Sequence, residues 1–240
     1  MSRELLKTTI ELIPTYNERE SVTPFVRAVF GLYPETSMMV LDDNSPDGTA
    51  DVVRGLQATF PNLHLHQRMS DRGFSKSYLD GFRKVLADNR YSYIVMMDVD
   101  FAHDPKEVQP MIERLASFDV VTGSRYVDGG GIENWDWKRR ILSRWANFYA
   151  RNILGIRVRD LTTGFICFRK EVLNKINLDA MASDGYAFLI EIKYKLLRAG
   201  FKMHEHPITL HERRLGQSKM SWGIIWESIW LPWKLRFKRI

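Results

Sequence analysis

The sequence has little of what marks a secreted or a membrane-spanning protein. Cys167 is the single cysteine among 240 residues. Neither an internal disulfide nor a cysteine-based zinc site can therefore form, which fits a reducing compartment. No run approaches the roughly 20 apolar residues of a spanning helix, and the first residues lack the apolar core of about 7–15 residues of a signal peptide. These absences predict a soluble or peripheral intracellular protein.

Three common ligand-binding motifs are also missing. No G-x-G-x-x-G follows the first expected strand, and no G-x-x-x-x-G-K-[ST] occurs anywhere, which argues against dinucleotide-binding and P-loop folds. The D-x-[DN]-x-[DN]-G spacing of an EF-hand is absent too. The composition itself, 45% hydrophobic and 27% charged residues, is that of an ordinary globular protein.

Positive charge is in excess, and it is unevenly placed. Lys and Arg number 35 against 29 Asp and Glu, which gives a net charge of +6, and an anionic partner is expected. Seven of the basic residues lie between Arg213 and Ile240, beside four of the seven tryptophans and a single acid, Glu227. A nucleic-acid-binding module is the alternative from another class, but no RNP-like or helix-turn-helix pattern is present. We therefore expect a phosphorylated metabolite or an anionic lipid, and no nucleic acid.

Short apolar runs alternate with helical patterns through the first half of the chain. The runs typical of strands are residues 8–13, 37–41, 63–66, 92–97 and 119–122, and the helical patterns are residues 21–30, 49–59, 73–86 and 105–116. This alternation predicts an α/β fold with a mostly parallel sheet and helices on both faces. Ligands of such sheets bind beyond the carboxyl ends of the strands, so the loops that follow strands are the expected site.

The second half has a different pattern. Residues 135–154 predict a helix closed by Gly155, followed by a strand over 164–169, a helix over 186–198 and a strand near 202–210. The helix over 135–154 has two faces: an apolar stripe of Trp137, Ile141, Trp145, Phe148 and Tyr149, and a basic face of Arg140, Arg144 and Arg151.

The tail, residues 220–240, predicts a C-terminal amphipathic helical extension beyond one domain over 1–219. Trp222, Trp226, Ile229, Trp233 and Phe237 share one side of an ideal helix, and indole rings with Lys and Arg are typical interfacial anchors. Ile224, Leu231 and Leu235 lie on the far side, and Pro232 interrupts the pattern. Packing against the domain, or against a membrane-embedded partner, is therefore an equal alternative to a membrane surface.

Acidic residues follow three of the expected strands, in the segments 14–18, 42–49 and 98–100. One such carboxylate can cap a helix, as we expect of Asp47 or Thr49. Three acidic segments at one sheet edge are costly unless a cation or a donor-rich ligand compensates their charge. Asp98 and Asp100 are two residues apart, so an extended backbone places both on one side, where with a diphosphate they could hold Mg²⁺ or Mn²⁺.

Further segments complete a recognisable pattern. They are Gly123-Ser124-Arg125-Tyr126, Trp137-Lys138-Arg139-Arg140 with Ser143-Arg144, Asp160-Leu161-Thr162-Thr163-Gly164-Phe165, Gly185-Tyr186 with Phe188 and Glu191, and Arg213 six residues before Lys219. With the acidic loops, they resemble the family 2 glycosyltransferases of the Rossmann-like GT-A fold, and within these the dolichol-phosphate (polyprenol-phosphate) mannose synthases. The resemblance covers residues 8–220, and its basic segments narrow it to the lipid-phosphate branch.

The resemblance implies a metal-dependent, inverting transfer of mannose from GDP-mannose to a polyprenyl (dolichyl-type) phosphate. The residues that match the nucleotide-sugar site are Pro14, Tyr16, Glu18, Leu41, Asp43, Asp98, Val99, Asp100, Arg213 and Lys219, with Asp98 and Asp100 as the metal ligands. Asp100, Arg125, Arg213 and Lys219 are the implied catalytic residues. The three basic ones match residues at the pyrophosphate, where cations would neutralise charge on the leaving diphosphate. The domain over 1–219 would thus be the catalytic one.

The implied acceptor phosphate site comprises Arg125, Arg139, Arg140 and Ser143. A phosphomonoester is largely dianionic near neutral pH, so it needs cations for positioning and no general base. A basic helix with a tryptophan-rich face suits a lipid phosphate at a membrane. We therefore expect a peripheral protein on the cytosolic face of a membrane, or a subunit held there by a membrane-anchoring partner.

The chain departs from the family pattern at a few positions. Ala102 stands where a Gln or Ser is common, and Asp184 stands where a Lys is common. The alternative within the same fold is a UDP-glucose donor or a soluble acceptor, for which Asp184 or Glu191 would be the candidate base. Cys167 is expected in the core, and His204, His206 and His211 are expected to be structural.

Overall fold

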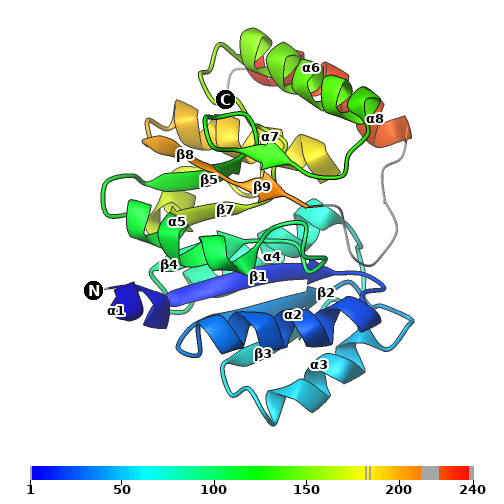
Figure 1. The fold of residues 1–240 in the computed structure, drawn as a ribbon, viewed down its shortest axis with the longest axis vertical. Helices are drawn as coiled ribbons and strands as arrows, with labels where there is room; N and C mark the ends of the chain where they lie inside the picture. The colour runs from blue at the N-terminus through cyan, green and yellow to red at the C-terminus, as the bar shows by residue number, and fades with distance from the viewer. Residues whose placement is uncertain (1, 182, 184, 212–221, 238–240) are drawn as a thin grey trace.

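The computed structural model describes residues 2–181, 183, 185–211 and 222–237. Most of the strands in these residues form one seven-stranded sheet. Its strands are β1 (Thr9–Thr15), β2 (Ser37–Asp42), β3 (Leu63–Gln67), β4 (Tyr93–Met96), β5 (Val120–Ser124), β7 (Ile166–Arg169) and β8 (Met203–Pro207). The order across the sheet is β3-β2-β1-β4-β7-β5-β8, and β7 alone runs antiparallel to its neighbours β4 and β5. The prediction of a mostly parallel sheet is confirmed (Figure 1).

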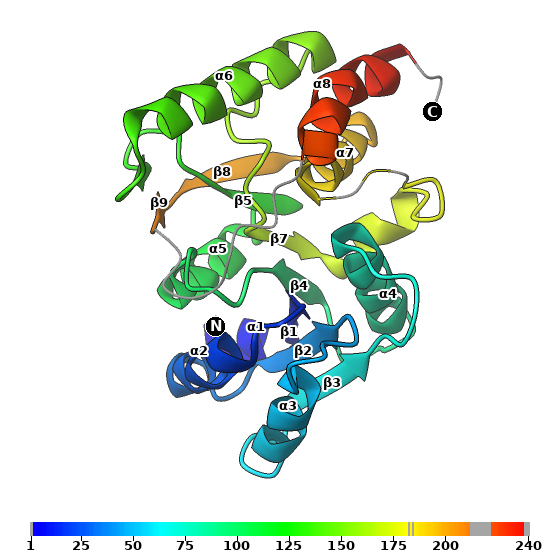
Figure 2. The same cartoon turned by 90° about the vertical axis from the view of Figure 1, so that its right-hand side faces the viewer.

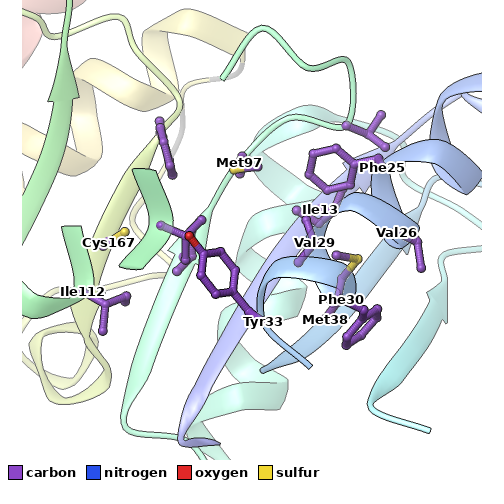
Figure 3. Packing of buried hydrophobic residues seen from close by; sticks show 14 of the residues in the cluster. Ile13, Phe25, Val26, Val29, Phe30, Tyr33, Met38, Met97, Ile112 and Cys167 are labelled. Carbon is purple, nitrogen blue, oxygen red and sulfur yellow. The ribbon is translucent and has the colours of Figure 1, made fainter. Parts of the chain in front are cut away.

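Helices cover both faces of this sheet, as the sequence predicted. The helices are α1 (Ser2–Lys7), α2 (Arg19–Leu32), α3 (Thr49–Gln57), α4 (Phe74–Leu86), α5 (Val108–Arg114), α6 (Trp137–Leu154), α7 (Gly185–Arg198) and α8 (Trp222–Phe237), with short 3-10 helices η1 (Pro105–Glu107) and η2 (Lys170–Lys175). One core cluster joins the sheet to α2, α3 and α5, and includes Phe25, Met38 and Cys167 (Figure 3). A second cluster joins the opposite face to α4 and α7 through Tyr78, Phe82 and Phe188.

Local sequence signals explain where several elements begin and end. The N-cap of α3 is Gly48, with a φ of 85°, so the prediction that Asp47 or Thr49 is the cap is wrong by one residue. Asp47 lies just before the cap, and its Oδ1 accepts hydrogen bonds from the N–H of Thr49 at 3.0 Å and from its hydroxyl at 2.6 Å. Gly155 ends α6 with a φ of 67°, a left-handed conformation that glycine adopts without steric cost. The expected strand near 202–210 is divided into β8 and a short β9 (Thr209–Leu210), which pairs with β6 (Gly131–Ile132) outside the main sheet.

The helix α6 does not pack through the apolar stripe that its sequence shows. Its buried side chains are Asn147, Ala150 and Leu154. Ala150 and Leu154 join side chains of α7 and α8 in a third core cluster, and Figure 2 shows these helices on the same side of the sheet. Trp137 is 67% exposed and Trp145 is 53% exposed. Most of the stripe that hydropathy alone would assign to the core therefore faces outward. Its last member, Tyr149, is half-buried, and its hydroxyl donates to the carbonyl of Ile229 in α8 at 3.0 Å.

The tail helix α8 uses both of its apolar sides. Leu231 and Leu235 are buried against α6 and α7, and the helix continues through Pro232 to Phe237. Trp230, Trp233 and Phe237 are exposed. We call the exposed apolar side chains of the two helices the aromatic face: Trp137, Ile141, Leu142, Trp145 and Phe148 on α6, and Trp230, Trp233 and Phe237 on α8. None of the helices among the described residues is long and apolar enough to cross a membrane.

Candidate active site

The three acidic loops meet at one edge of the sheet. β1 lies between β2 and β4 and pairs with both in parallel, so the carboxyl ends of the three strands point the same way. Each loop contains a residue with a positive φ angle: Asn17 at 58°, Asn44 at 55° and Phe101 at 60°. Asn tolerates this left-handed region, whereas a bulky side chain is strained there. The strained turn at Phe101 directly follows Asp100.

Asp43 is held at this edge by a buried arginine. Its carboxylate accepts hydrogen bonds from the N–H of Gly73 at 3.0 Å, from the hydroxyl of Ser77 at 2.8 Å and from Arg68. Arg68 also binds Asp80 at 2.7 Å. These contacts fix the orientation of the Asp43 carboxylate, the acidic side chain that the resemblance assigns to the nucleoside.

The other predicted nucleoside residues fall into two groups. Tyr16 and Glu18 present polar groups: the Tyr16 hydroxyl accepts a hydrogen bond from Arg72 at 2.6 Å, and the Glu18 N–H donates to Thr49 Oγ1 at 3.1 Å. Pro14 lies near the end of β1 and is half-buried. Leu41 has its side chain in the core, so at this edge it offers its main chain.

Asp98 and Asp100 lie in the loop after β4, as predicted. Asp100 Oδ1 accepts the N–H of Ala102 at 3.0 Å, and Val99 between them is buried in the core. A Cβ placed on Gly164 would lie 3.7 Å from Asp98 Oδ2, so the main chain of Gly164 lies beside this carboxylate.

Two carboxylates fit a divalent cation shared with a phosphorylated ligand. Mg²⁺ and Mn²⁺ prefer oxygen ligands, and Mg²⁺ in particular is usually held by one or two carboxylates plus substrate phosphates and water. Among the described residues no group of three His, Cys, Asp or Glu side chains is placed to hold a metal. Asp98 and Asp100 would therefore supply the protein ligands, and the remaining positions would be left to diphosphate oxygens and water.

Arg125 forms a buried ion pair with Asp160. Its Nε and Nη2 lie 2.7 Å from the two carboxylate oxygens, and Nη2 also donates to Thr162 Oγ1 at 2.7 Å. Burial by itself raises the pKa of Asp160, but the adjacent guanidinium outweighs it and holds this pKa below its ordinary value. The pair joins the end of β5 to the segment of residues 160–164.

The start of α6 brings most of the predicted acceptor residues together around two aromatic rings. The guanidinium of Arg139 lies 3.8 Å from the ring centroid of Trp135, and that of Arg125 lies 5.7 Å from the same centroid. The Tyr126 hydroxyl donates to Ser143 Oγ at 2.7 Å. Arg140 donates to the carbonyl of Ile132 at 2.9 Å, so it lies at the side of this group facing β6.

Arg213 and Lys219 lie outside the described residues. The last described residue before them is His211, whose N–H donates to the carbonyl of Ala102 at 3.0 Å. His211 itself therefore lies beside the loop that contains Asp100. Asp184, the alternative base, also lies outside the described residues, whereas Glu191 is buried and paired with Lys195 at 2.9 Å.

Comparison with known proteins identifies the family. A model described as glycosyl transferase family 2 matches residues 12–176. The chain belongs to this family. A polyprenol monophosphomannose synthase of Mycolicibacterium smegmatis is 41% identical over 95% of this chain and 87% of its own length. An undecaprenyl-phosphate mannosyltransferase of Micrococcus luteus is 38% identical over 92% of this chain and 90% of its own.

Solved structures show the same fold. Glucosyl-3-phosphoglycerate synthase of Mycobacterium tuberculosis, crystallised with Mn²⁺, UDP-glucose and phosphoglyceric acid, superposes with a TM-score of 0.67 at 15% identity. The match covers 97% of this chain and 84% of that one. The GT-A fold expected of a family 2 glycosyltransferase is thus confirmed, and at this identity the likeness concerns the fold alone.

Sequence reasoning missed several buried polar residues near the site. Arg68 holds Asp43 in place but lies in no motif that the sequence shows. Asp160 lies in a recognised segment, but its role as the partner of Arg125 was not predicted. Lys193 is fully buried and donates to the carbonyls of Asp160 at 3.0 Å and Thr163 at 2.9 Å, and burial lowers its pKa to about 7. Burial also lowers the pKa of His103 to about 4. Two features of the sequence could have pointed to these residues: Lys193 is a lysine within an apolar helix, and His103 is a histidine three residues after Asp100.

Proposed function

We propose that this chain transfers mannose from GDP-mannose to a polyprenyl phosphate in a single inverting displacement. Two relatives at 41% and 38% identity have names that specify mannose and a polyprenyl or undecaprenyl lipid. The observation that most supports the proposal is the connection between two charged regions. Gly164 lies beside the Asp98 carboxylate, and Thr162, two residues earlier, binds Arg125 in the arginine-rich region by α6.

The acidic region would hold the donor. Asp98 and Asp100 would bind Mg²⁺ or Mn²⁺, which when present neutralises charge on the diphosphate. Tyr16, Glu18 and Asp43 would contact the nucleoside, with Arg68 keeping the Asp43 carboxylate in place. Arg213 and Lys219 would bind the leaving diphosphate, because fixed cations there stabilise the negative charge that develops as the glycosidic bond breaks.

The arginine-rich region would hold the acceptor. A lipid phosphate is already largely ionised near neutral pH, so its oxygen can attack the sugar without a protein base. Arg125, Arg139, Arg140 and Ser143 would orient that oxygen toward the anomeric carbon on the face opposite the diphosphate. A single attack from that side inverts the anomeric configuration, and the transition state has oxocarbenium character.

The aromatic face would bring the enzyme to its lipid substrate. Exposed apolar patches mark interaction sites, and Trp residues beside Lys and Arg favour the membrane interface. Trp137 on this face directly follows the α6 cap residue Asp136 and lies near Arg139 in sequence. A membrane surface on the cytosolic side, or a membrane-anchoring partner, would therefore cover α6 and α8.

Radiolabel transfer into an organic-extractable product tests the proposal. The wild-type chain is incubated with labelled GDP-mannose, a short polyprenyl phosphate and Mg²⁺ or Mn²⁺, with EDTA and the free polyprenol as controls. We expect label in the organic phase that EDTA abolishes and that Asp100→Ala and Arg213→Ala each reduce at least 100-fold. Label that persists fully in either variant would contradict the site assignment.

The alternative donor is an arm of the same assay. The UDP-glucose bound in the M. tuberculosis structures makes UDP-glucose the comparison of choice. Transfer from UDP-glucose and none from GDP-mannose would keep the fold and overturn the proposed sugar. Transfer from GDP-mannose into a water-soluble product only would overturn the lipid acceptor.

A further inference from the structure

Trp135 lies close to two arginines that come from different elements. Arg125 follows β5 and Arg139 lies in the first turn of α6, and both guanidinium groups are placed near the indole ring, at 5.7 Å and 3.8 Å from its centroid. The two guanidinium carbons can therefore be no farther apart than the sum of these distances, about 9.5 Å. Trp135 itself is half-buried.

Two arginines this close repel each other unless something compensates. The face of an indole ring carries partial negative charge, and it attracts a guanidinium group within about 6 Å of the ring centroid. One edge of Arg125 is also neutralised by Asp160, whereas no ion pair is seen for Arg139 among the described residues. Among the described residues, the indole of Trp135 is therefore the group that holds the Arg139 guanidinium near that of Arg125.

The surrounding contacts fix the start of α6, which directly follows Trp135 and Asp136, relative to the rest of the protein. The next residue, Asp136, caps α6 by accepting the N–H of Arg139 at 2.9 Å. Tyr126, next to Arg125, binds Ser143 one turn further along α6. Asn147 then ties α6 to the segment of residues 160–164, because its Oδ1 accepts the N–H of Leu161 at 2.7 Å.

We propose that Trp135 is a positioning residue that holds Arg125 and Arg139 together as one phosphate-binding pair for the acceptor. The inference rests on the proposed function for the identity of the acceptor. It assigns to the indole ring the task of keeping two cations at a spacing that one phosphate dianion can bridge. Guanidinium groups bind phosphate through planar pairs of N–H donors, so their orientation matters as well as their charge.

Calorimetric titration of the full chain with geranyl phosphate, in the presence of GDP and Mn²⁺, tests this inference without requiring turnover. Trp135→Leu removes the aromatic ring but keeps an apolar side chain, whereas Trp135→Phe keeps an aromatic ring. We expect Trp135→Leu to weaken geranyl phosphate binding about tenfold, and Trp135→Phe to retain most of the affinity. GDP affinity and the thermal midpoint of unfolding should stay unchanged in both variants.

A double-mutant cycle with Arg139→Leu tests whether Trp135 affects geranyl phosphate binding through Arg139. If Trp135 acts through Arg139, the double variant should bind geranyl phosphate no more weakly than Arg139→Leu alone. The inference would be overturned if the two substitutions weakened geranyl phosphate binding additively. It would also be overturned if GDP affinity fell as much as geranyl phosphate affinity, or if Trp135→Phe and Trp135→Leu weakened geranyl phosphate binding equally. Wild-type protein that binds geraniol as tightly as geranyl phosphate would overturn it as well. The proposed function is judged separately, by sugar transfer, and it can fail while this binding result holds.

Discussion

At the scale of single residues, Glu11 places a carboxyl group in the middle of the sheet. It lies on β1 and is fully buried, and neither of its oxygens has a hydrogen-bond partner among the described residues. Burial is the main reason why the pKa values of Tyr33 and Cys167 are raised. A negative charge on Glu11 would raise both of them further. Burial raises the pKa of Glu11 from 4.5 to about 8. The folded protein therefore contains a neutral Glu11 at pH 7.

This pKa predicts that the protein loses stability as the pH rises from about 5 to 8. In that window Glu11 ionises in the unfolded chain but stays protonated in the folded one, so unfolding releases a proton. We expect the free energy of unfolding of the wild type to fall, relative to Glu11→Gln, by up to about 1.4 kcal/mol per pH unit. Urea unfolding of both proteins across this range measures the difference. Glu20→Gln, on the exposed side of α2, serves as the control, and parallel curves for wild type and Glu11→Gln would refute the prediction.

The sequence could not reveal such residues. The apolar run at residues 8–13 predicted a buried strand, and the strand is there, but a hydropathy pattern does not say whether a polar residue within it finds a partner. The same holds for His103 and Lys193, whose importance depends on contacts with residues far away in the sequence. By contrast, Asp98 and Asp100 could be predicted because the loop after a parallel strand is set by local sequence.

At the scale of elements, α6 shows where pattern and packing diverge. The prediction of a helix over 135–154 is confirmed to within two residues, and its basic and apolar faces are real. Periodicity shows that two faces exist, but not which one meets the protein. Here the small residue Ala150 packs in the core cluster that includes Leu231 and Leu235 of α8, and the polar Asn147 is buried because it binds Leu161 and Thr162. The tail helix had two apolar sides in its sequence, and among its described side chains Leu231 and Leu235 of one side are buried whereas Trp233 and Phe237 of the other are exposed.

The exposed side of α6 predicts binding to lipid vesicles. The double variant Trp137→Ser, Phe148→Ser removes two large apolar side chains, each worth roughly 1.5–3 kcal/mol when fully buried. We expect its partitioning onto anionic vesicles, measured by co-sedimentation, to fall at least tenfold, while transfer to soluble geranyl phosphate stays close to wild type. Leu32→Ser, Met69→Ser is the matched control, since both residues are exposed and distant in sequence from α6. Equal losses in the two double variants would argue against the aromatic face.

At the scale of the whole molecule, the fold places two charged regions on either side of one short segment. The alternation of strands and helices predicted the parallel half of the sheet, β1 to β4, and the meeting of its acidic loops. It did not predict that β7 enters antiparallel between β4 and β5, because strand order depends on long-range pairing. That insertion matters for the site, since it delivers residues 160–164 from α6 to the carboxyl end of β4. The segment reaches the Asp98 carboxylate at Gly164 and Arg125 at Thr162.

Gly164→Ala tests whether this close approach serves the reaction. A Cβ there would lie 3.7 Å from Asp98 Oδ2 and 3.8 Å from Leu189 Cδ1, which are ordinary contact distances, so the variant should fold with a thermal midpoint within about 3 °C of wild type. The added methyl group would take the place of water or ligand atoms beside the carboxylate. We expect the Mn²⁺ concentration needed for half-maximal transfer to rise about tenfold, because a metal ligand partly shielded by a methyl group binds its ion less well. Gly55→Ala, on α3 with no atom within 4 Å of the new Cβ, is the same substitution away from the site and should leave the metal requirement unchanged. An unchanged metal requirement in Gly164→Ala would show that the segment joins the two regions without shaping the cation site.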